Sequence, residues 1–383
     1  MTALKVLFAP FYTSDPYQSR LEEELRKFDV EVHRVPSVGT EHPSFVELVR
    51  SFRPDLLHLH WLHPWFLAPG LIRTMVRARV FCRQLKEARS LGAGLVWTAH
   101  NLVNHDRVHP RIDGQVTRKV ARSADGIVVH GEQARAQLIR FCGKEIADRV
   151  EVIPLGNHIG VYPNEVGRTA ARQRLGVEPR QIMFLFLGRI RPYKGVFELI
   201  DAFAEAAPNN PCVLHIAGKT SGEETRLRLK RRCKKTPGVV LHYGFVPDDE
   251  IQVYMNAADF VVLPYLDILS SAATVLAASF GKAVIAPRLP CLTEFVHPEG
   301  AILYEPGEPR GLAGAIEAAA PARERAEEMG RLNLEVAERN PWSLSAERTA
   351  RLYRRILDRK VPRQRPPGAR SPSPKGQPRE GEC

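Results

Sequence analysis

Three cations follow a short apolar segment in the middle of the chain. Residues 182–187 are all apolar, which is typical of a strand buried on both faces. Gly188 ends this segment, and the next residues include Arg189, Arg191 and Lys194. Residues 196–206 then have helical periodicity. A helix N-terminus favours an anion through its free N–H groups and its dipole, and nearby cations add charge. The segment therefore predicts a diphosphate clamp, with a solvated surface loop as the plainer alternative.

A second segment with the composition of an anion site spans residues 263–286 and consists of a loop, a predicted helix and the start of the next strand. Small residues occupy positions 270–273, immediately before a segment with helical periodicity. Small side chains would let a diphosphate approach the helix N-terminus, where the hydroxyls of Ser270 and Ser271 would be donors.

Histidines and aromatic residues follow several predicted strands of the first half. His58, His60 and His63 lie close together in the sequence, with Trp61 and Trp65 between and after them. The chain offers no accompanying carboxylate cluster, so we favour substrate hydrogen bonding by His60 and ring stacking by the tryptophans over a metal site.

His100 ends another predicted strand. Its imidazole could donate a hydrogen bond to a substrate or stabilise developing charge, whereas a polar strand end is the alternative. His105 and Asp106 follow shortly afterwards and could supply a general base.

These residues lie among alternating strands and helices that indicate two doubly wound (Rossmann-like) α/β domains facing a cleft. The length of 383 residues also suits two domains. We expect strands at residues 4–9, 30–35, 55–60, 94–98, 126–130 and 150–154 in the first half, and at 182–187, 213–217, 239–242, 260–264, 283–286 and 301–304 in the second.

Gly188-Arg189 followed by Tyr193-Lys194-Gly195 resembles the donor-diphosphate loop of nucleotide-sugar glycosyltransferases with the GT-B fold, family-4-like (group 1). The resemblance extends to about residue 358. It implies a glycosyltransferase in which Arg189 and Lys194 hold the diphosphate of a UDP- or GDP-sugar and His100 lies at the reacting sugar. It implies no cofactor or metal, because fixed cations would replace a metal ion.

The resemblance also implies further donor and acceptor contacts. The remaining donor-site residues would be Gly188, Lys219, Phe245, Val246, Asp267, Ser270, Ser271 and Glu294. The acceptor, a hydroxyl compound that could be lipid-linked, would lie against Tyr12, Gln18, His60 and Trp61, with Ser14, Asp15 and Tyr17 also offering polar contacts.

One departure from the family concerns two glutamates that usually lie eight positions apart, the second of which holds the ribose. Aligned on Phe280-Gly281-Lys282, these positions are Leu269 and Ala277, so both carboxylates are missing. The Tyr-x-Asp-x-Leu-x-Ser loop at residues 265–271 has some likeness to exopolysaccharide-type mannosyltransferases. Retention or inversion at the sugar is therefore left open, and a non-catalytic GT-B scaffold is the alternative function.

The predicted domains are 1–162 on the acceptor side and 163–340 on the donor side, a helix at 341–359 that the resemblance implies crosses back to the first domain, and a disordered basic, Pro-rich tail at 360–383. The scattered cysteines and the absence of a signal peptide or spanning segment predict a cytoplasmic protein.

The net charge of +12 favours anionic partners. Nucleic acid ranks low among these, because no recognised binding module is present. Residues 71–91 form a basic segment with apolar residues at helical spacing. It could rest on the inner face of the membrane, or it could pack its apolar side on the sheet and leave its cations in water.

Overall fold

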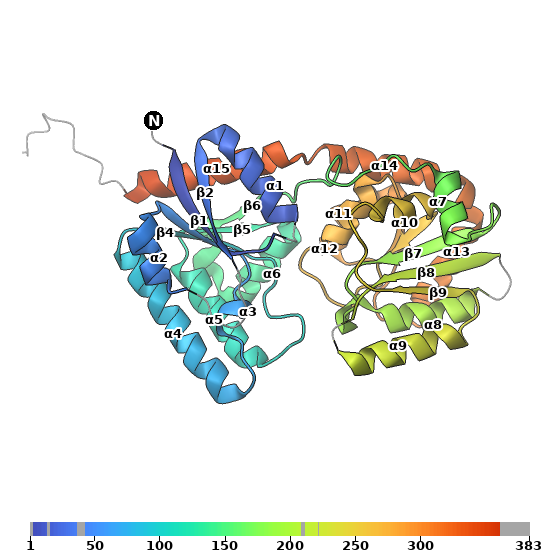
Figure 1. Cartoon of the computed structure of the whole chain (residues 1–383), viewed down its shortest axis with the longest axis horizontal. Helices are drawn as coiled ribbons and strands as arrows, with labels where there is room; N and C mark the ends of the chain where they lie inside the picture. Colours follow the sequence, from blue (N-terminus) through green and yellow to red (C-terminus); the bar gives the residue numbers. More distant parts are fainter. Residues whose placement is uncertain (1–2, 14–15, 37–42, 208–210, 221, 361–383) are drawn as a thin grey trace, which may run out of the picture.

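The chain forms two α/β domains that lie side by side (Figure 1). The computed structural model describes residues 3–13, 16–36, 43–207, 211–220 and 222–360. Of the tail predicted at 360–383, residues 361–383 lie outside the described residues, whereas Lys360 is helical; Ser14 and Asp15 also lie outside.

The first domain is built on a six-stranded sheet in the order β2-β1-β3-β4-β5-β6, in which neighbouring strands are parallel. Its strands are β1 (Leu4–Phe11), β2 (Val30–Pro36), β3 (Leu56–Leu59), β4 (Gly94–Thr98), β5 (Gly126–Val129) and β6 (Val150–Val152). Its helices are α1 (Pro16–Leu25), α2 (Phe45–Phe52), α3 (His63–Phe66), α4 (Leu71–Ser90), α5 (Pro110–Ser123) and α6 (Glu132–Cys142).

The second domain repeats this plan with six parallel strands in the order β12-β11-β10-β7-β8-β9. The strands are β7 (Ile182–Leu187), β8 (Cys212–Gly218), β9 (Val239–Tyr243), β10 (Phe260–Val262), β11 (Ala283–Pro287) and β12 (Ala301–Tyr304). The helices are α7 (Arg168–Leu175), α8 (Val196–Ala206), α9 (Glu223–Lys235), α10 (Ile251–Ala257), α11 (Ala272–Ser279), α12 (Pro290–Thr293), α13 (Gly311–Ala322) and α14 (Ala326–Glu338). The predicted pair of doubly wound domains is confirmed.

The last helix, α15 (Trp342–Lys360), packs on the first domain. The hydroxyl of Tyr353 lies 2.5 Å from Nδ1 of His58, a buried residue of β3. The same apolar cluster includes Val275 and Phe295 of the second domain. The two domains therefore share apolar contacts beyond the connecting segments.

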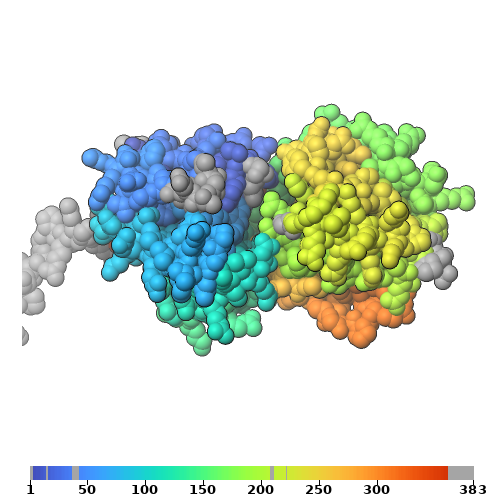
Figure 2. Space-filling view, turned by 60° about the horizontal axis from the view of Figure 1, so that its bottom comes forward, coloured from blue at the N-terminus to red at the C-terminus, as the bar shows by residue number. Residues whose placement is uncertain are grey.

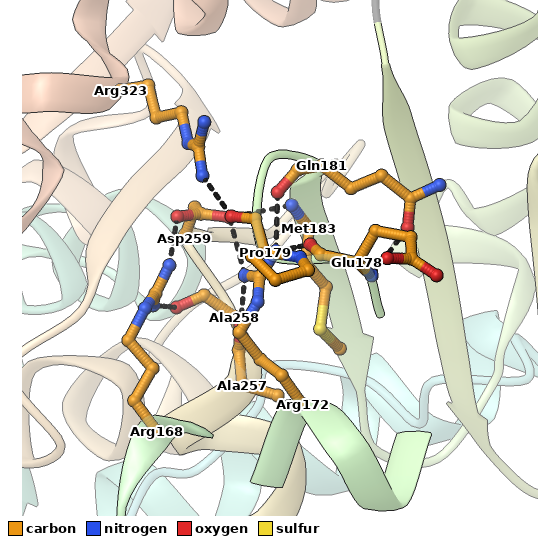
Figure 3. Close-up of polar contacts among 10 residues, drawn as sticks. All are labelled: Arg168, Arg172, Glu178, Pro179, Gln181, Met183, Ala257, Ala258, Asp259 and Arg323. Atoms are coloured by element: carbon orange, nitrogen blue, oxygen red, sulfur yellow. Dashed lines mark hydrogen bonds and ion pairs between the residues drawn. The ribbon is translucent and has the colours of Figure 1, made fainter. Parts of the chain in front are cut away.

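A buried ionic network secures the amino edge of the second sheet (Figure 3). Asp259 accepts a hydrogen bond from Arg172 at 3.2 Å, and its carboxylate also pairs with Arg168 at 2.5 Å. The Arg172 guanidinium also donates to backbone carbonyl groups, including that of Ala257 at 3.0 Å. The N–H of Met183 donates to the same carboxylate at 2.7 Å. The charges of Arg172 and Asp259 are thus both compensated where α7, β7 and β10 meet.

Candidate active site

A cleft of about 640 Å³ lies where the carboxyl edges of the two sheets meet. Both domains and α15 contribute to its wall: Pro16, Tyr17, Leu155, His158, Tyr162, Leu187, Gly188, Arg189, Lys194, Gly218, Lys219, Thr220, Gly244, Phe245, Val246, Ile251, Ala272, Ala273, Leu276 and Trp342. Six residues predicted for the donor site are in this list, which are Gly188, Arg189, Lys194, Lys219, Phe245 and Val246.

Two glycines shape the floor of the cleft where β7 and β8 end. Gly188 has a φ of +135°, and a Cβ on Gly218 would lie 1.9 Å from the carbonyl oxygen of Gly188. A side chain at position 218 would therefore separate the two strand ends. The isolated bridge between Ile190 and Thr220 continues this close approach into the two loops.

Arg189, Lys194 and Lys219 bring positive charge to the cleft without a compensating carboxylate. Among the described residues, no Asp or Glu oxygen lies within 4.0 Å of their nitrogens, whereas the neighbouring Arg191 pairs with Asp106 at 3.3 Å. Burial, followed by the nearby guanidinium groups, lowers the pKa of Lys194, and the Tyr193 hydroxyl opposes that shift. An anion bound here would relieve this charge.

Lys194 is also held in place by its surroundings. Its Nζ lies 5.3 Å from the centroid of the Tyr265 ring, which is a cation–π distance. A Cβ built on Gly188 would be only 3.5 Å from the same Nζ. The ammonium group thus lies beside Gly188, in the same cleft that Ala272 and Ala273 of α11 line.

The loop before α11 presents backbone groups to the cleft. Ser271 is the N-cap, and its side-chain oxygen accepts a hydrogen bond from the N–H of Thr274 at 3.2 Å. Ala272 and Ala273 line the cleft, whereas Ser270 does not. The Ser271 hydroxyl therefore caps the helix, and an anion site here would have to use backbone N–H groups of α11 instead of the predicted hydroxyls.

Three residues of the second domain contact the first domain, namely Asp267, Leu269 and Glu294. For Asp267 and Glu294 the sequence predicted contacts with the donor instead. Asp267 pairs with Arg107 at 3.1 Å, and Leu269 enters the apolar core of the first domain. Glu294 accepts a hydrogen bond from the backbone N–H of Gln133 at 2.9 Å, at the first turn of α6. These side chains link the domains and do not line the cleft. A single sequence gave no signal for this partner choice.

The helix that would carry the second family glutamate offers only apolar side chains to the cleft. Ala272, Ala273 and Leu276 of α11 line the cleft, whereas Ala277 is fully buried. No carboxylate is therefore available from this helix. A polar group of the cleft wall is His158, which is 6% exposed and whose Nδ1 has no hydrogen-bond partner among the described residues. Sequence reasoning missed His158, because it lies in a connecting segment without a motif.

Four histidine rings lie at the carboxyl edge of the first sheet. The ring centroids are 4.4 Å apart for His58 and His60, 5.8 Å for His60 and His100, and 5.4 Å for His100 and His130. Burial lowers the pKa of all four, to about 3 for His58 and to about 4 for His130. The rings are therefore neutral at pH 7. In the described part of the chain, no group of three His, Cys, Asp or Glu residues has a metal-binding arrangement.

His100 lies beside the cleft. Trp61 stacks on its ring with centroids 4.4 Å apart, and Tyr17, which lines the cleft, contacts the ring edge at 4.9 Å. Nε2 of His100 is buried and has no partner among the described residues. This nitrogen is an unused hydrogen-bonding group next to the cleft.

The other residues predicted for the acceptor differ in what they can contact. Tyr12 and Trp61 are half-buried and meet edge to face at 5.1 Å. Gln18 is fully buried, donates to the Pro10 carbonyl at 2.7 Å and accepts from the Tyr12 N–H, so it supports the loop and does not reach the cleft.

His60 is only 1% exposed, and both of its ring nitrogens lack partners among the described residues. Trp65, also predicted to stack on substrate, packs on Phe45 in the core. Substrate contact by His60 or Trp65 is therefore not supported by this arrangement.

The predicted alternative bases are also engaged. The His105 ring stacks on Tyr193 with centroids 4.6 Å apart, and Asp106 pairs with Arg191. Both contacts join the first domain to the loop that carries Lys194. His105 and Asp106 thus help to seat the cation loop against the first domain.

Comparison with known proteins agrees with this geometry. Residues 167–333 match the family described as glycosyl transferases group 1, and residues 6–156 match the glycosyl transferase 4-like domain. The chain is thus a glycosyltransferase whose second domain matches the group 1 model and whose first domain matches the 4-like model. The predicted activity, transfer of a sugar from a nucleotide sugar to an acceptor, is confirmed at the level of the enzyme class.

Named relatives share the activity class at low identity. The chain is 26% identical to the D-inositol 3-phosphate glycosyltransferase of Pseudarthrobacter chlorophenolicus over 283 residues, covering 70% of this chain and 67% of that protein. It is 27% identical to the enzyme of the same name from Segniliparus rotundus over 324 residues, covering 80% and 67%.

Solved structures share the GT-B fold. Sucrose-phosphate synthase from Thermosynechococcus elongatus superposes with a TM-score of 0.75 at 19% identity, covering 93% of this chain and 100% of that one. HepE from Anabaena, in complex with UDP and glucose, superposes with a TM-score of 0.69 at 19% identity, covering 91% and 98%.

Proposed function

We propose that this enzyme transfers a hexose from a UDP- or GDP-sugar to a hydroxyl acceptor without a metal ion. The observation that carries the proposal is the set of three cleft cations, Arg189, Lys194 and Lys219, with no carboxylate partner among the described residues. These cations and the α11 N-terminus would neutralise the diphosphate that departs. UDP is our first choice, because HepE was solved with UDP.

In the proposed reaction, the acceptor oxygen forms a bond to C1 of the sugar while the bond from C1 to the diphosphate oxygen breaks. The nucleoside diphosphate leaves with the electron pair of that bond. None of the described cleft-lining residues is Asp or Glu, so we propose that the acceptor proton passes to the departing diphosphate. His100 would donate a hydrogen bond to the sugar from its free Nε2–H tautomer.

The nucleoside would lie along the second domain. Phe245 is 77% exposed and lines the cleft, so its ring is available to stack on the base. His158 would hydrogen-bond the ribose through Nδ1 in place of the missing glutamate. We expect His158→Ala to weaken UDP binding about ten-fold, in line with the loss of one hydrogen bond. His158→Asn, which can still donate and accept, should retain part of the affinity.

The acceptor would enter from the first domain, and we propose that it is presented at the inner face of a membrane. The described residues contain no helix long and apolar enough to cross a membrane. Helix α4 nevertheless exposes Ile72, Val76 and Val80 beside arginines, which favours contact with a lipid surface.

The test of the donor site is titration calorimetry with UDP, GDP, ADP and dTDP. We expect one nucleotide to bind, and the double variant Arg189→Ala/Lys194→Ala to weaken its affinity at least about 100-fold, because two charge-assisted contacts are lost. Arg191→Ala is the matched control, since Arg191 comes from the same loop but pairs with Asp106.

Equal weakening by the control and the double variant would mean that general charge, and not the clamp, holds the nucleotide. Failure of every nucleotide to bind to folded protein would refute the donor site. Turnover of the matching nucleotide sugar then tests transfer itself.

A further inference from the structure

Helix α4 has two apolar faces, and only one of them is covered. Thr74, Ala78, Phe81, Leu85 and Ala88 form the buried face that packs on the first domain. On the opposite side, Ile72 is 73% exposed, Val76 is 51% exposed and Val80 is 37% exposed. These three residues recur every fourth position, so they form one stripe along the helix. The helix therefore packs one apolar face on its own domain, as one of the two predicted arrangements requires, and leaves a second apolar stripe exposed.

Exposed cations border this stripe. They are Arg73, Arg79, Arg83 and Lys86. The one acidic residue of the helix is Glu87, whose carboxylate lies 3.7 Å from Arg50 of α2. The exposed side of α4 is thus apolar along its centre and positive along its margins.

Helix α9 gives the second domain a similar surface. Leu227 is 49% exposed, and the exposed cations around it are Arg228, Lys230, Arg231, Lys234 and Lys235. Among the described residues, no carboxylate oxygen lies within 4.0 Å of the nitrogens of these five side chains. Arg226 and Arg232 of the same helix do pair, with Glu223 and Asp201 respectively.

The two helices lie on one side of the molecule. Figure 1 shows α4 and α9 along the lower edge of the first and second domain, and Figure 2, with that edge turned forward, shows both on the face in view. Each helix begins at the carboxyl edge of its sheet, because α4 follows β3 and α9 follows β8. The segment that leads into α9 also lines the cleft, at Thr220.

We propose that the exposed sides of α4 and α9, here called the two-helix face, dock on the surface of an anionic lipid bilayer. Charge complementarity supplies the long-range attraction, and the aliphatic residues enter the headgroup region. A nucleic acid would also pair with the cations, but its backbone would not bind the exposed aliphatic stripe of Ile72, Val76 and Val80. This proposal deepens the membrane-presented acceptor of the proposed function, since docking through both domains places the cleft next to the lipid headgroups.

The experiment is co-sedimentation of the full chain with phosphatidylcholine vesicles and with vesicles in which one third of the lipid is phosphatidylglycerol. We expect binding to the anionic vesicles alone, and weaker binding in 0.5 M salt because exposed charges are screened. Arg231→Gln/Lys234→Gln should weaken binding about 25-fold, at about five-fold per cation. Ile72→Ser/Val76→Ser/Val80→Ser should weaken it about ten-fold.

The control is Arg351→Gln/Arg359→Gln, which removes the same charge from exposed positions of α15 on the opposite side of the molecule (Figure 1). Binding that the control reduces as much as the α9 variant would overturn the proposal. The proposal would also be overturned if the α4 variant weakened vesicle binding but the α9 variant did not. Tighter binding to an oligonucleotide than to anionic vesicles would overturn it as well. Binding of UDP is measured separately by calorimetry. A failure of vesicle binding therefore does not count against the donor site, and a failure of UDP binding does not count against docking.

Discussion

The two edges of the second sheet use cations in opposite ways. At the amino edge, Arg168 and Arg172 share the carboxylate of Asp259 and donate to backbone carbonyl groups (Figure 3). At the carboxyl edge, Arg189 and Lys194 have no carboxylate within 4.0 Å among the described residues. A protein compensates charges that serve its fold, whereas charges that serve a ligand are left for the ligand to compensate. This difference separates structural from functional cations more clearly than residue type does.

Removing the shared carboxylate should have the largest effect. Asp259→Asn leaves the buried Arg172 guanidinium without its counter-ion, so we expect the free energy of unfolding to fall by about 3–5 kcal/mol. Urea unfolding followed by circular dichroism measures this change. A loss below about 1 kcal/mol would mean that the backbone carbonyl contacts of Arg172 suffice without the carboxylate.

Removing a cleft cation should lower nucleotide affinity without lowering the stability of the fold. Lys194→Met keeps the volume of the side chain but removes its charge, so we expect nucleotide affinity to fall by about 2–3 kcal/mol with unfolding free energy unchanged or slightly raised. Calorimetry and urea unfolding on the same variant separate these two effects. A destabilised variant with normal affinity would place Lys194 with the structural cations.

Acidification should weaken the first domain through its buried histidines. Burial lowers the pKa of His58 from 6.5 to about 3, so the unfolded chain takes up a proton on this residue below pH 6.5 while the folded chain does not. Its contribution to stability is therefore present above pH 6.5 and is lost as pH falls toward 3. Between pH 7 and pH 5 the loss should be about 2 kcal/mol. His58→Gln should flatten this part of the stability profile, and an unchanged slope would contradict the assignment.

An exposed ion pair between the domains should have the smallest effect. The side chains of Asp267 and Arg107 are 69% and 71% exposed, so Asp267→Asn should change the free energy of unfolding by less than about 1 kcal/mol. We expect the KM for the donor to change less than three-fold. An increase of ten-fold or more would restore Asp267 to the donor site that the sequence predicted.

Much of the fold was predictable because local patterns and long-range packing agree. Residues 182–187 are continuously apolar and form β7 between β10 and β8, where both faces are buried. The loop from Gly188 to Lys194 was predictable for a similar reason, since glycine, cation and helix start occur together within a few residues. Site residues that depend on contacts distant in sequence could not be found in this way.

The partners of polar side chains were the part of the site that the sequence did not provide. Glu294, Asp267 and Gln18 are polar residues near predicted strand or helix ends, and their sequence neighbourhood indicated ligand contacts. Their actual partners are the Gln133 N–H, Arg107 and the Pro10 carbonyl. Two of these partners lie more than 150 positions away in the chain, so no local pattern contains them.

The sequence by itself determined the alternation of strands and helices and the Arg189–Lys194 loop, because periodicity, glycine placement and charge are local properties. Only the tertiary structure decided which polar groups are left without partners. Among the described residues, it showed that Lys194 has no carboxylate partner and that Nδ1 of His158 has no hydrogen-bond partner. It also showed that α4 and α9 lie on one side of the molecule. The physical reason is that compensation of a charge or a hydrogen bond depends on atoms brought together by folding.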